Sequence, residues 1–224
     1  MSEPLLNVRD LSHRYAGHAD IPFGTFALGA GKILLARGAS GCGKSTLLHL
    51  LGGVLPIASN CGSATLDGRD IATMSSSARD RLRPLLVGWM PQRQFMINSL
   101  SVLENVLLPV SLAGTVDPNA RKRAKQLIDD LAISELTNQR PTTLSVGQAA
   151  RVCLARAFLA GPKLLLADEP TAALDEASSR LVAAQITAFV ARGGAAIVAS
   201  HDPQLRAWLA ADNSANFFEL ELPR

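Results

Sequence analysis

The chain has 224 residues, of which 48% are hydrophobic, and its formal net charge is +3. This length suits one large domain or two small ones, and every apolar run stops well short of the ~18 residues that a transmembrane helix needs. The N-terminus carries an early acid, Glu3, and no long apolar segment, which argues against a secretory signal. These features predict a soluble, cytoplasmic α/β protein.

Cysteine spacing and charge exclude two further classes of protein. The three cysteines are far apart and form no C-x-x-C pair, which argues against a zinc site and against a disulfide framework. The densest basic cluster, residues 121–125, is followed by Asp129 and Asp130, so a solvated helix face is favoured over a nucleic-acid or lipid patch. We therefore expect no nucleic-acid partner.

A strand is predicted at residues 5–11, followed by a turn over residues 12–17. Tyr15, the only tyrosine, lies in that turn. Its ring could stack on a nucleotide base, and a half-buried edge residue fits the spacing equally well.

A glycine-rich loop at residues 38–46 reads G-A-S-G-C-G-K-S-T and matches G-x-x-x-x-G-K-[ST] in full. An apolar run at 33–36 precedes it and leucines at helical spacing follow, which predicts strand, loop and helix. The glycines let backbone N–H groups turn inward around a phosphate, and the dipole of a helix beginning near Lys44 favours an anion there. We expect Lys44 to reach the β and γ phosphates and the Ser45 hydroxyl to ligate Mg²⁺. The predicted phosphate-binding set is Gly38, Ala39, Ser40, Gly41, Cys42, Gly43, Lys44, Ser45 and Thr46.

Two strands are predicted after this loop, at residues 63–66 with a tight turn at Asp67-Gly68, and at residues 87–90. Gln92 follows the second of these strands where the loop begins. An amide there can ligate Mg²⁺ through its oxygen or orient a water, and an ordinary loop glutamine is the alternative.

The segment from about residue 95 to residue 159 differs from its surroundings in the spacing of its apolar residues. Apolar residues recur at helical spacing over 102–110, 118–131 and 147–159, with glycine and proline turn signals between them. We predict a helical insertion at 95–159 in a single domain whose core comprises residues 1–94 and 160–224.

Two acids end the next predicted strand. Residues 164–167 form an apolar run typical of a strand covered on both faces, and Asp168 and Glu169 follow it. Acids at the end of a buried strand are costly without a cation or chemistry to meet, so Asp168 is a candidate Mg²⁺ group and Glu169 a candidate base or water-orienting group. A helix at 177–190 and a strand at 195–199 follow, and His201 lies at the carboxyl end of that strand.

A further segment, L-S-V-G-Q at residues 144–148, completes a set of motifs that resembles the nucleotide-binding subunits of ATP-binding cassette (ABC) transporters. The segment is similar to that family's signature motif. The resemblance covers essentially the whole chain and includes Tyr15 as the adenine-stacking aromatic, Gln92 as the loop glutamine, Asp175 in the loop after the acids and His201 as the switch histidine. It implies a P-loop NTPase RecA-like core with an antiparallel β subdomain and an inserted α-helical subdomain. Residues 87–92 and 101–109 are most similar to the lipoprotein-releasing, macrolide-exporting and cell-division group.

The resemblance also implies a mechanism and partners. Two copies would close head to tail around two ATP molecules and Mg²⁺, and the signature residues Ser145, Gly147 and Gln148 would complete the site on the opposite copy. A separate integral-membrane permease would hold the protein at the inner face of the membrane and be driven for export or mechanical extraction. The alternative is a regulatory module that signals to a membrane partner without moving a substrate.

The signature departs from the usual pattern at one position, where this chain has Val146 and the family has glycine. A Cβ there restricts how closely the backbone approaches phosphate. We expect nucleotide binding to survive, because the helix N-terminus and Ser145 still supply donors, and hydrolysis to be slower.

Overall fold

The computed structural model describes residues 3–114, 116–211 and 216–223. Its elements in chain order are β1 (Leu6–His13), β2 (Ile21–Leu28), β3 (Ile33–Arg37), α1 (Lys44–Leu51), β4 (Ser63–Leu66), β5 (Arg69–Asp70), α2 (Ser76–Leu86), β6 (Val87–Met90), α3 (Val102–Leu112), α4 (Pro118–Asp130), two short 3₁₀ turns (Ser134–Leu136 and Pro141–Thr143), α5 (Val146–Phe158), β7 (Leu164–Asp168), α6 (Glu176–Ala191), β8 (Ala195–Ala199), α7 (Pro203–Ala211) and β9 (Phe217–Glu221).

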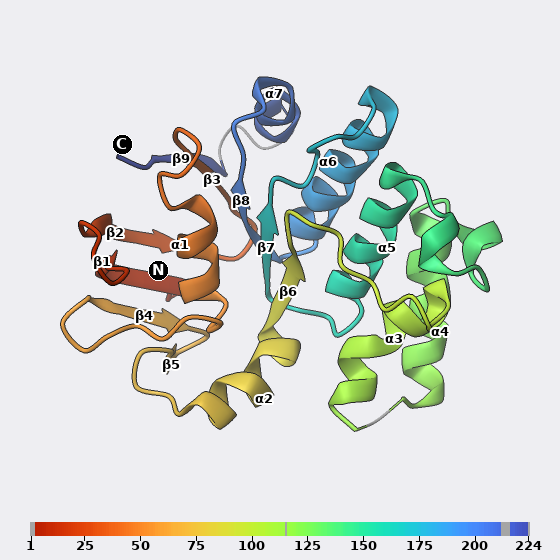
Figure 1. Ribbon diagram of the computed structural model, residues 1–224, viewed down its shortest axis with the longest axis horizontal. Coiled ribbons are helices and arrows are strands. Elements are labelled where there is room, and N and C mark those ends of the chain that lie inside the picture. Colours follow the sequence, from red (N-terminus) through yellow and green to blue (C-terminus); the bar gives the residue numbers. More distant parts are fainter. Residues whose placement is uncertain (1–2, 115, 212–215, 224) are drawn as a thin grey trace.

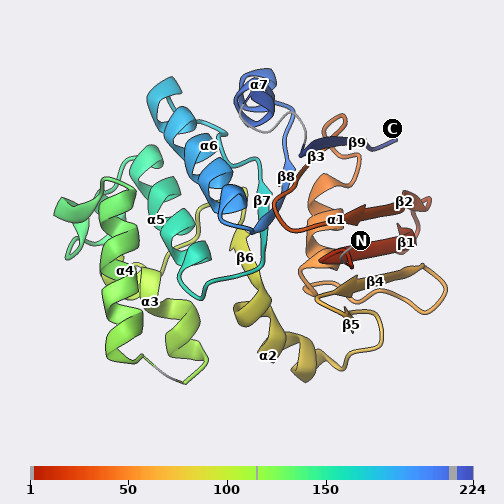
Figure 2. The same ribbon diagram turned by 180° about the vertical axis from the view of Figure 1, so that it is seen from behind.

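The central layer is a parallel sheet in the order β6-β7-β8-β3-β9. Helix α1 lies on one face of this sheet, and α5 and α6 lie on the other (Figure 1, Figure 2). The strands β7 and β8 are buried along their whole length, as their continuous apolar sequence predicts. A sheet covered on both faces therefore directs its functional residues to the strand ends.

Side chains of the central strands alternate between two hydrophobic cores. In β3, Ile33 and Leu35 face the core shared with the helices α3 to α7, whereas Leu34 and Ala36 face the core shared with α1 and the second sheet. This alternation follows from the period of two along a strand. The parallel sheet is thus fixed from both sides.

The second sheet is antiparallel, in the order β2-β1-β4-β5. Asp67 and Gly68, with φ of 51° and 73°, form the tight turn between β4 and β5 that the sequence predicts. The predicted end of the first strand at residue 11 is wrong, because Ser12 pairs with Pro22 and His13 with Ile21 in β2. The register shifts along this pair, and Asp10 adopts a φ of 45° there.

The helices of residues 102–158 have clear local start signals. Asp117 caps α4, and Ser101 and Ser145 cap α3 and α5 through capping boxes. The helix α5 contacts both α3 and the sheet strand β6, so it joins this helical region to the central sheet. Its first residues carry the signature motif.

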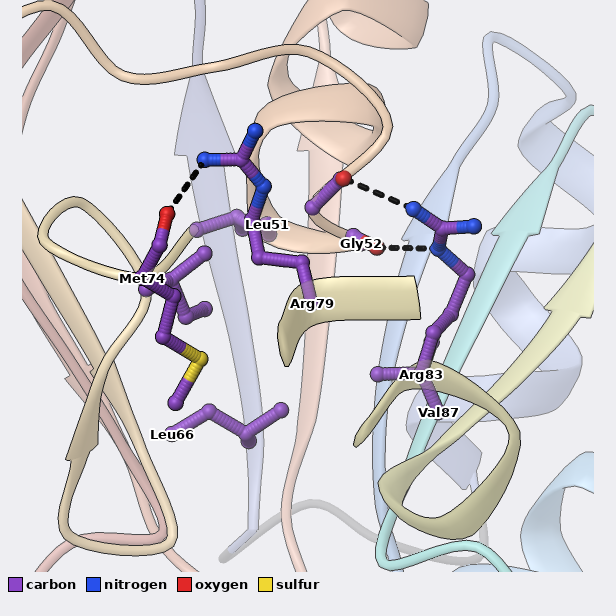
Figure 3. Close-up of a pocket in the computed structure, with 9 residues that line it drawn as sticks. Leu51, Gly52, Leu66, Met74, Arg79, Arg83 and Val87 are labelled. Atoms are coloured by element: carbon purple, nitrogen blue, oxygen red, sulfur yellow. Dashed lines mark hydrogen bonds between the residues drawn. The ribbon is translucent and has the colours of Figure 1, made fainter. Parts of the chain in front are cut away.

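Helix α2 is absent from the sequence prediction because it is strongly charged and contains Pro84. Its Arg83 donates from Nε to Gly52 O at 2.9 Å and from Nη2 to Gly53 O at 2.8 Å (Figure 3). These carbonyls follow the carboxyl end of α1, where a cation also complements the helix dipole. An apolar cavity beside this contact is lined by Leu51, Leu66, Ile71, Met74 and Val87.

Within the described part of the chain, no helix combines the length and apolar character needed to cross a membrane.

Candidate active site

Four parallel strands end at one edge of the central sheet, and each is followed by a predicted site residue. The glycine-rich loop follows β3, Gln92 follows β6, Asp168 ends β7 with Glu169 next to it, and His201 follows β8. The carboxyl edge of a parallel sheet is the usual place for a ligand site in an open α/β fold. The topology therefore gathers residues that are up to 163 positions apart, from Gly38 to His201.

The glycine-rich loop requires glycine at specific positions. Gly38 and Gly43 have φ of 146° and 100°, and a Cβ would lie 2.6 Å from Cys42 Sγ at Gly38 and 2.7 Å from Ile21 Cγ2 at Gly43. Lys44, with 8% of its surface exposed, donates from Nζ to Gly38 O at 2.9 Å and Ala39 O at 3.1 Å. The ammonium group is therefore held within the loop by two of the loop's own carbonyl groups.

Asp168 and Ser45 form a polar pair beside this loop. Burial raises the pKa of the Asp168 carboxyl, and a hydrogen bond from Ser45 acts in the opposite direction. Glu169 raises the pKa of Asp168 further, while His49 and Lys44 lower it. Asp168 is thus a carboxylate that gains from a nearby cation when it is ionised.

Both carboxylate oxygens of Glu169 have a partner on the segment after β8. His201 Nδ1 lies 2.7 Å from Glu169 Oε1, and Ser200 donates its hydroxyl to Glu169 Oε2 at 2.9 Å. An ionised carboxylate only accepts, so Nδ1 carries the hydrogen in this pair. Glu169 is buried, whereas 76% of the His201 side chain is exposed.

Tyr15 lies next to the helix that begins at the loop. Its hydroxyl is 3.1 Å from Thr46 Oγ1, and its ring packs edge-on against His13 with 4.5 Å between centroids. The ring is 41% exposed. Tyr15 is therefore tied to the phosphate loop at its hydroxyl end and keeps exposed aromatic surface.

The signature residues form a second, separate group at the start of α5. Gln148 N donates to Ser145 Oγ at 3.2 Å, and Ser145 N donates to Gln148 Oε1 at 2.9 Å. This cap uses the Ser145 oxygen as an acceptor, so its hydroxyl hydrogen can still be donated elsewhere. The exposed serine hydroxyl and the first N–H groups of α5 together present an anion-binding helix terminus.

Gly147 packs directly on α6. A Cβ at Gly147 would lie 2.6 Å from Ser178 Oγ, so this close approach requires glycine. Asp175 caps α6 by accepting from Ser178 N at 2.7 Å, and the hydrogen bonds from Ser178 lower the pKa of Asp175. The first turn of α6, which Asp175 caps, is thereby in contact with the signature motif of the same chain.

Two predicted residues stand outside the Lys44 and Glu169 group. Gln92 is exposed in the loop after β6, and among the described residues no hydrogen bond joins it to Lys44, Asp168 or Glu169. Val146 is 50% exposed at the first position of α5. The sequence did not point to Ser200 or Ser178, because a single serine carries no pattern until its distant partner is known.

A comparison with protein families decides what this arrangement is. The model of the ABC transporter family matches residues 24–172, two thirds of the chain. The chain belongs to the ABC transporter family. Its fold is that of the family's ATP-binding cassette, and the family consists of ATPases.

Curated relatives of this cassette include transporter proteins of two kinds. It is 37% identical over 214 residues to the lipoprotein-releasing system ATP-binding protein LolD 2 of Caulobacter vibrioides, covering 93% of both chains. It is also 37% identical over 211 residues to the macrolide export ATP-binding/permease protein MacB of Burkholderia pseudomallei strain 1710b. That match covers 92% of this chain and 32% of MacB, so this chain spans about a third of the length of MacB.

Solved structures of the ATP-binding cassette MJ0796 share this fold. A dimeric post-hydrolysis state bound to ADP and Pi superposes with a TM-score of 0.80 at 25% identity, and covers 98% of this chain and 97% of that one. A second dimeric structure of MJ0796, described as a bacterial ABC transporter cassette, gives a TM-score of 0.81 over the same shares.

Proposed function

We propose that this cassette is the ATP-hydrolysing subunit of a bacterial transporter, closing as a homodimer around two ATP molecules and driving a separate permease for export or mechanical extraction. The observation that carries the proposal is that the phosphate loop and the signature motif lie on different elements of the chain. Lys44 and Asp168 lie at the sheet edge, whereas Ser145 begins α5 and bonds within its own turn. In this proposal a second copy supplies the missing half of each site, and the dimeric structures of MJ0796 support such an arrangement.

Each side chain has a role in this proposal that its position supports. Tyr15 stacks on adenine through its exposed ring, and residues 38–46 hold the phosphates through N–H groups and Lys44. Ser145, Gly147 and Gln148 of the other copy form the turn that faces the γ phosphate, and Asp175 stabilises the neighbouring helix. Glu169 orients the attacking water and His201 holds the γ phosphate, so that catalysis rests on positioning and electrostatics.

The residues at the sheet edge fit Mg²⁺. Ser45 and the buried Asp168 are hard oxygen donors in mutual contact, and burial makes the ionised form of Asp168 costly without a cation. Within the described residues no cluster of three or more His, Cys, Asp or Glu side chains forms a self-sufficient metal site. In the proposed site the ion keeps phosphate and water ligands, with Gln92 as a further ligand. When bound, Mg²⁺ would neutralise charge that develops on the phosphates.

The proposed permease contact lies on the helical region and the loop that leads to it. We retain residues 95–159 as the inserted subdomain, with residues 1–94 and 160–224 as the core. Phe95 is 71% exposed and Leu112 is 79% exposed, and apolar surface of this kind is typical of protein contacts. Binding there places the protein on the cytoplasmic face of the inner membrane.

A Glu169→Gln variant tests the proposed roles. Removing the water-orienting carboxylate while retaining ATP binding is expected to lower kcat at least 100-fold and to trap an ATP-dependent dimer. Hydrolysis is measured by phosphate release and mass by light scattering, with and without ATP and Mg²⁺. The control, Lys44→Ala, should form no such dimer. A Glu169→Gln protein that hydrolyses ATP normally and stays monomeric would contradict the proposal.

A further inference from the structure

Ser200 is a buried hydroxyl at the centre of a hydrogen-bonded chain behind Glu169. It is 1% exposed, and its hydroxyl donates to Glu169 Oε2 at 2.9 Å. The same oxygen accepts from Asp202 N at 3.1 Å. Ser200 therefore connects the carboxylate after β7 to the backbone after β8, across 31 positions of sequence.

The direction of the Ser200 hydroxyl is set by its neighbours. A serine oxygen has one hydrogen, and because Asp202 N already donates to that oxygen, the hydrogen is left for Glu169. Asp202 is itself fixed, since its Oδ2 accepts from Thr171 Oγ1 at 3.0 Å and its Oδ1 accepts from Gln204 N at 2.8 Å. The donor that meets Glu169 is thus preorganised.

The two side chains that hydrogen-bond to Glu169 differ in how far they can move. The backbone of Glu169 is held in a left-handed conformation, with φ of 43°, and its N–H donates to Ala199 O at 2.8 Å. Its side chain still has rotatable bonds that only contacts can fix. His201 is largely exposed and can move when a phosphate arrives, whereas Ser200 is buried and stays in place.

We infer that Ser200 is a positioning residue for ATP hydrolysis, which holds Glu169 Oε2 so that Oε1 remains directed at the His201 side of the site. The inference rests on the proposed role of Glu169. Ser200 touches no reacting atom in this scheme. It acts by limiting the carboxylate to the orientation in which one oxygen meets the attacking water.

The test compares Ser200→Ala with Ser200→Thr. Loss of one hydrogen bond to a charged group is expected to lower kcat about 10-fold in Ser200→Ala while KM for ATP stays within about twofold, because the nucleotide contacts are elsewhere. Ser200→Thr keeps a hydroxyl and should recover kcat to within about threefold of the wild type. Ser179→Ala, at another buried serine on α6, controls for removing a buried hydroxyl and should leave kcat unchanged.

A double variant separates an effect through Glu169 from a general loss of structure. In a Glu169→Ala background, measured by single-turnover hydrolysis, adding Ser200→Ala should change the rate by less than about twofold. The inference is overturned if Ser200→Ala keeps wild-type kcat, if Ser200→Thr is as slow as Ser200→Ala while both bind ATP normally, or if the two losses multiply. Normal hydrolysis by Glu169→Gln would instead contradict the proposed function itself.

Discussion

Single residues at helix starts in this chain show how one hydroxyl group or one side chain changes what a motif can do. Ser101 and Ser145 both cap helices through capping boxes, but the Ser101 hydroxyl also donates to Glu104 Oε2 at 2.8 Å. In the Ser145 box the partner is Gln148, and the cap uses only the serine oxygen. The second box therefore leaves the serine hydrogen available for another acceptor, and the first is committed to its own helix.

Val146 is the residue at which the signature departs from the family pattern. Replacing it with glycine is expected to raise kcat about fivefold. Without the Cβ, the phosphate bound by the other copy can come closer to the N–H groups of α5, and the gain corresponds to about one additional hydrogen bond in the transition state. Steady-state ATP hydrolysis measures the effect. Val146→Ala retains the Cβ and serves as the matched control, with a smaller gain. Unchanged turnover and nucleotide affinity in Val146→Gly would show that the isopropyl group does not limit the site.

At the scale of elements, the capping box of α3 links helix stability to pH. Hydrogen bonds from Ser101 lower the pKa of Glu104 below its ordinary value. A carboxyl with a depressed folded pKa contributes stability above its unfolded pKa, and that contribution is lost as the pH falls through the folded value. The contribution of this cap is therefore complete at neutral pH and declines in acid.

Ser101→Ala tests this link. The variant is expected to lower Tm by about 3 °C at pH 7 and by a smaller amount at an acidic pH at which Glu104 has gained its proton. Thermal unfolding followed by circular dichroism at both pH values provides the comparison. Glu104→Gln keeps the box but removes its ionisation, so in that background the effect of Ser101→Ala should no longer depend on pH. An equal loss at both pH values in the Glu104 protein would contradict the link.

The sequence predicted elements best where local pattern and burial agree. The strands β6 and β8 lie at the predicted residues, because a short apolar run between turn signals leaves few alternatives. The sequence pattern does not predict the strands β2, β5 and β9 or the helices α2 and α7. In β2, Pro22 and Gly24 disfavour a strand, and pairing with β1 supplies the missing stability.

The residues of the candidate site also fall into those that the local sequence indicates and those that only the folded structure shows. Lys44, Asp168 and Glu169 were identified because a loop motif and two strand-end acids are visible locally, and the parallel sheet then places them at one edge. The roles of Ser200 and Ser178 depend on contacts with Glu169 and Gly147 that only the folded chain brings about. Local pattern thus points to the groups proposed to meet the ligand, and the fold shows which side chains hold them.

At the scale of the whole molecule, the phosphate loop and the signature motif belong to different elements of one chain, and the proposed function requires two copies to complete each site. Lys44→Ala removes the phosphate-binding lysine, and Ser145→Arg blocks the signature face. A pair made of one copy of each variant has one site with both defects and one site with neither. Two inactive proteins should therefore complement each other only if the site is shared.

The most direct test measures this complementation by energy transfer between labelled copies, with Glu169→Gln in both chains to prevent hydrolysis. Shared sites predict that Lys44→Ala and Ser145→Arg copies associate when ATP and Mg²⁺ are added, and that neither variant associates with itself. If the mixed pair also fails to associate while Glu169→Gln alone dimerises, each site is contained in one chain and the account is contradicted.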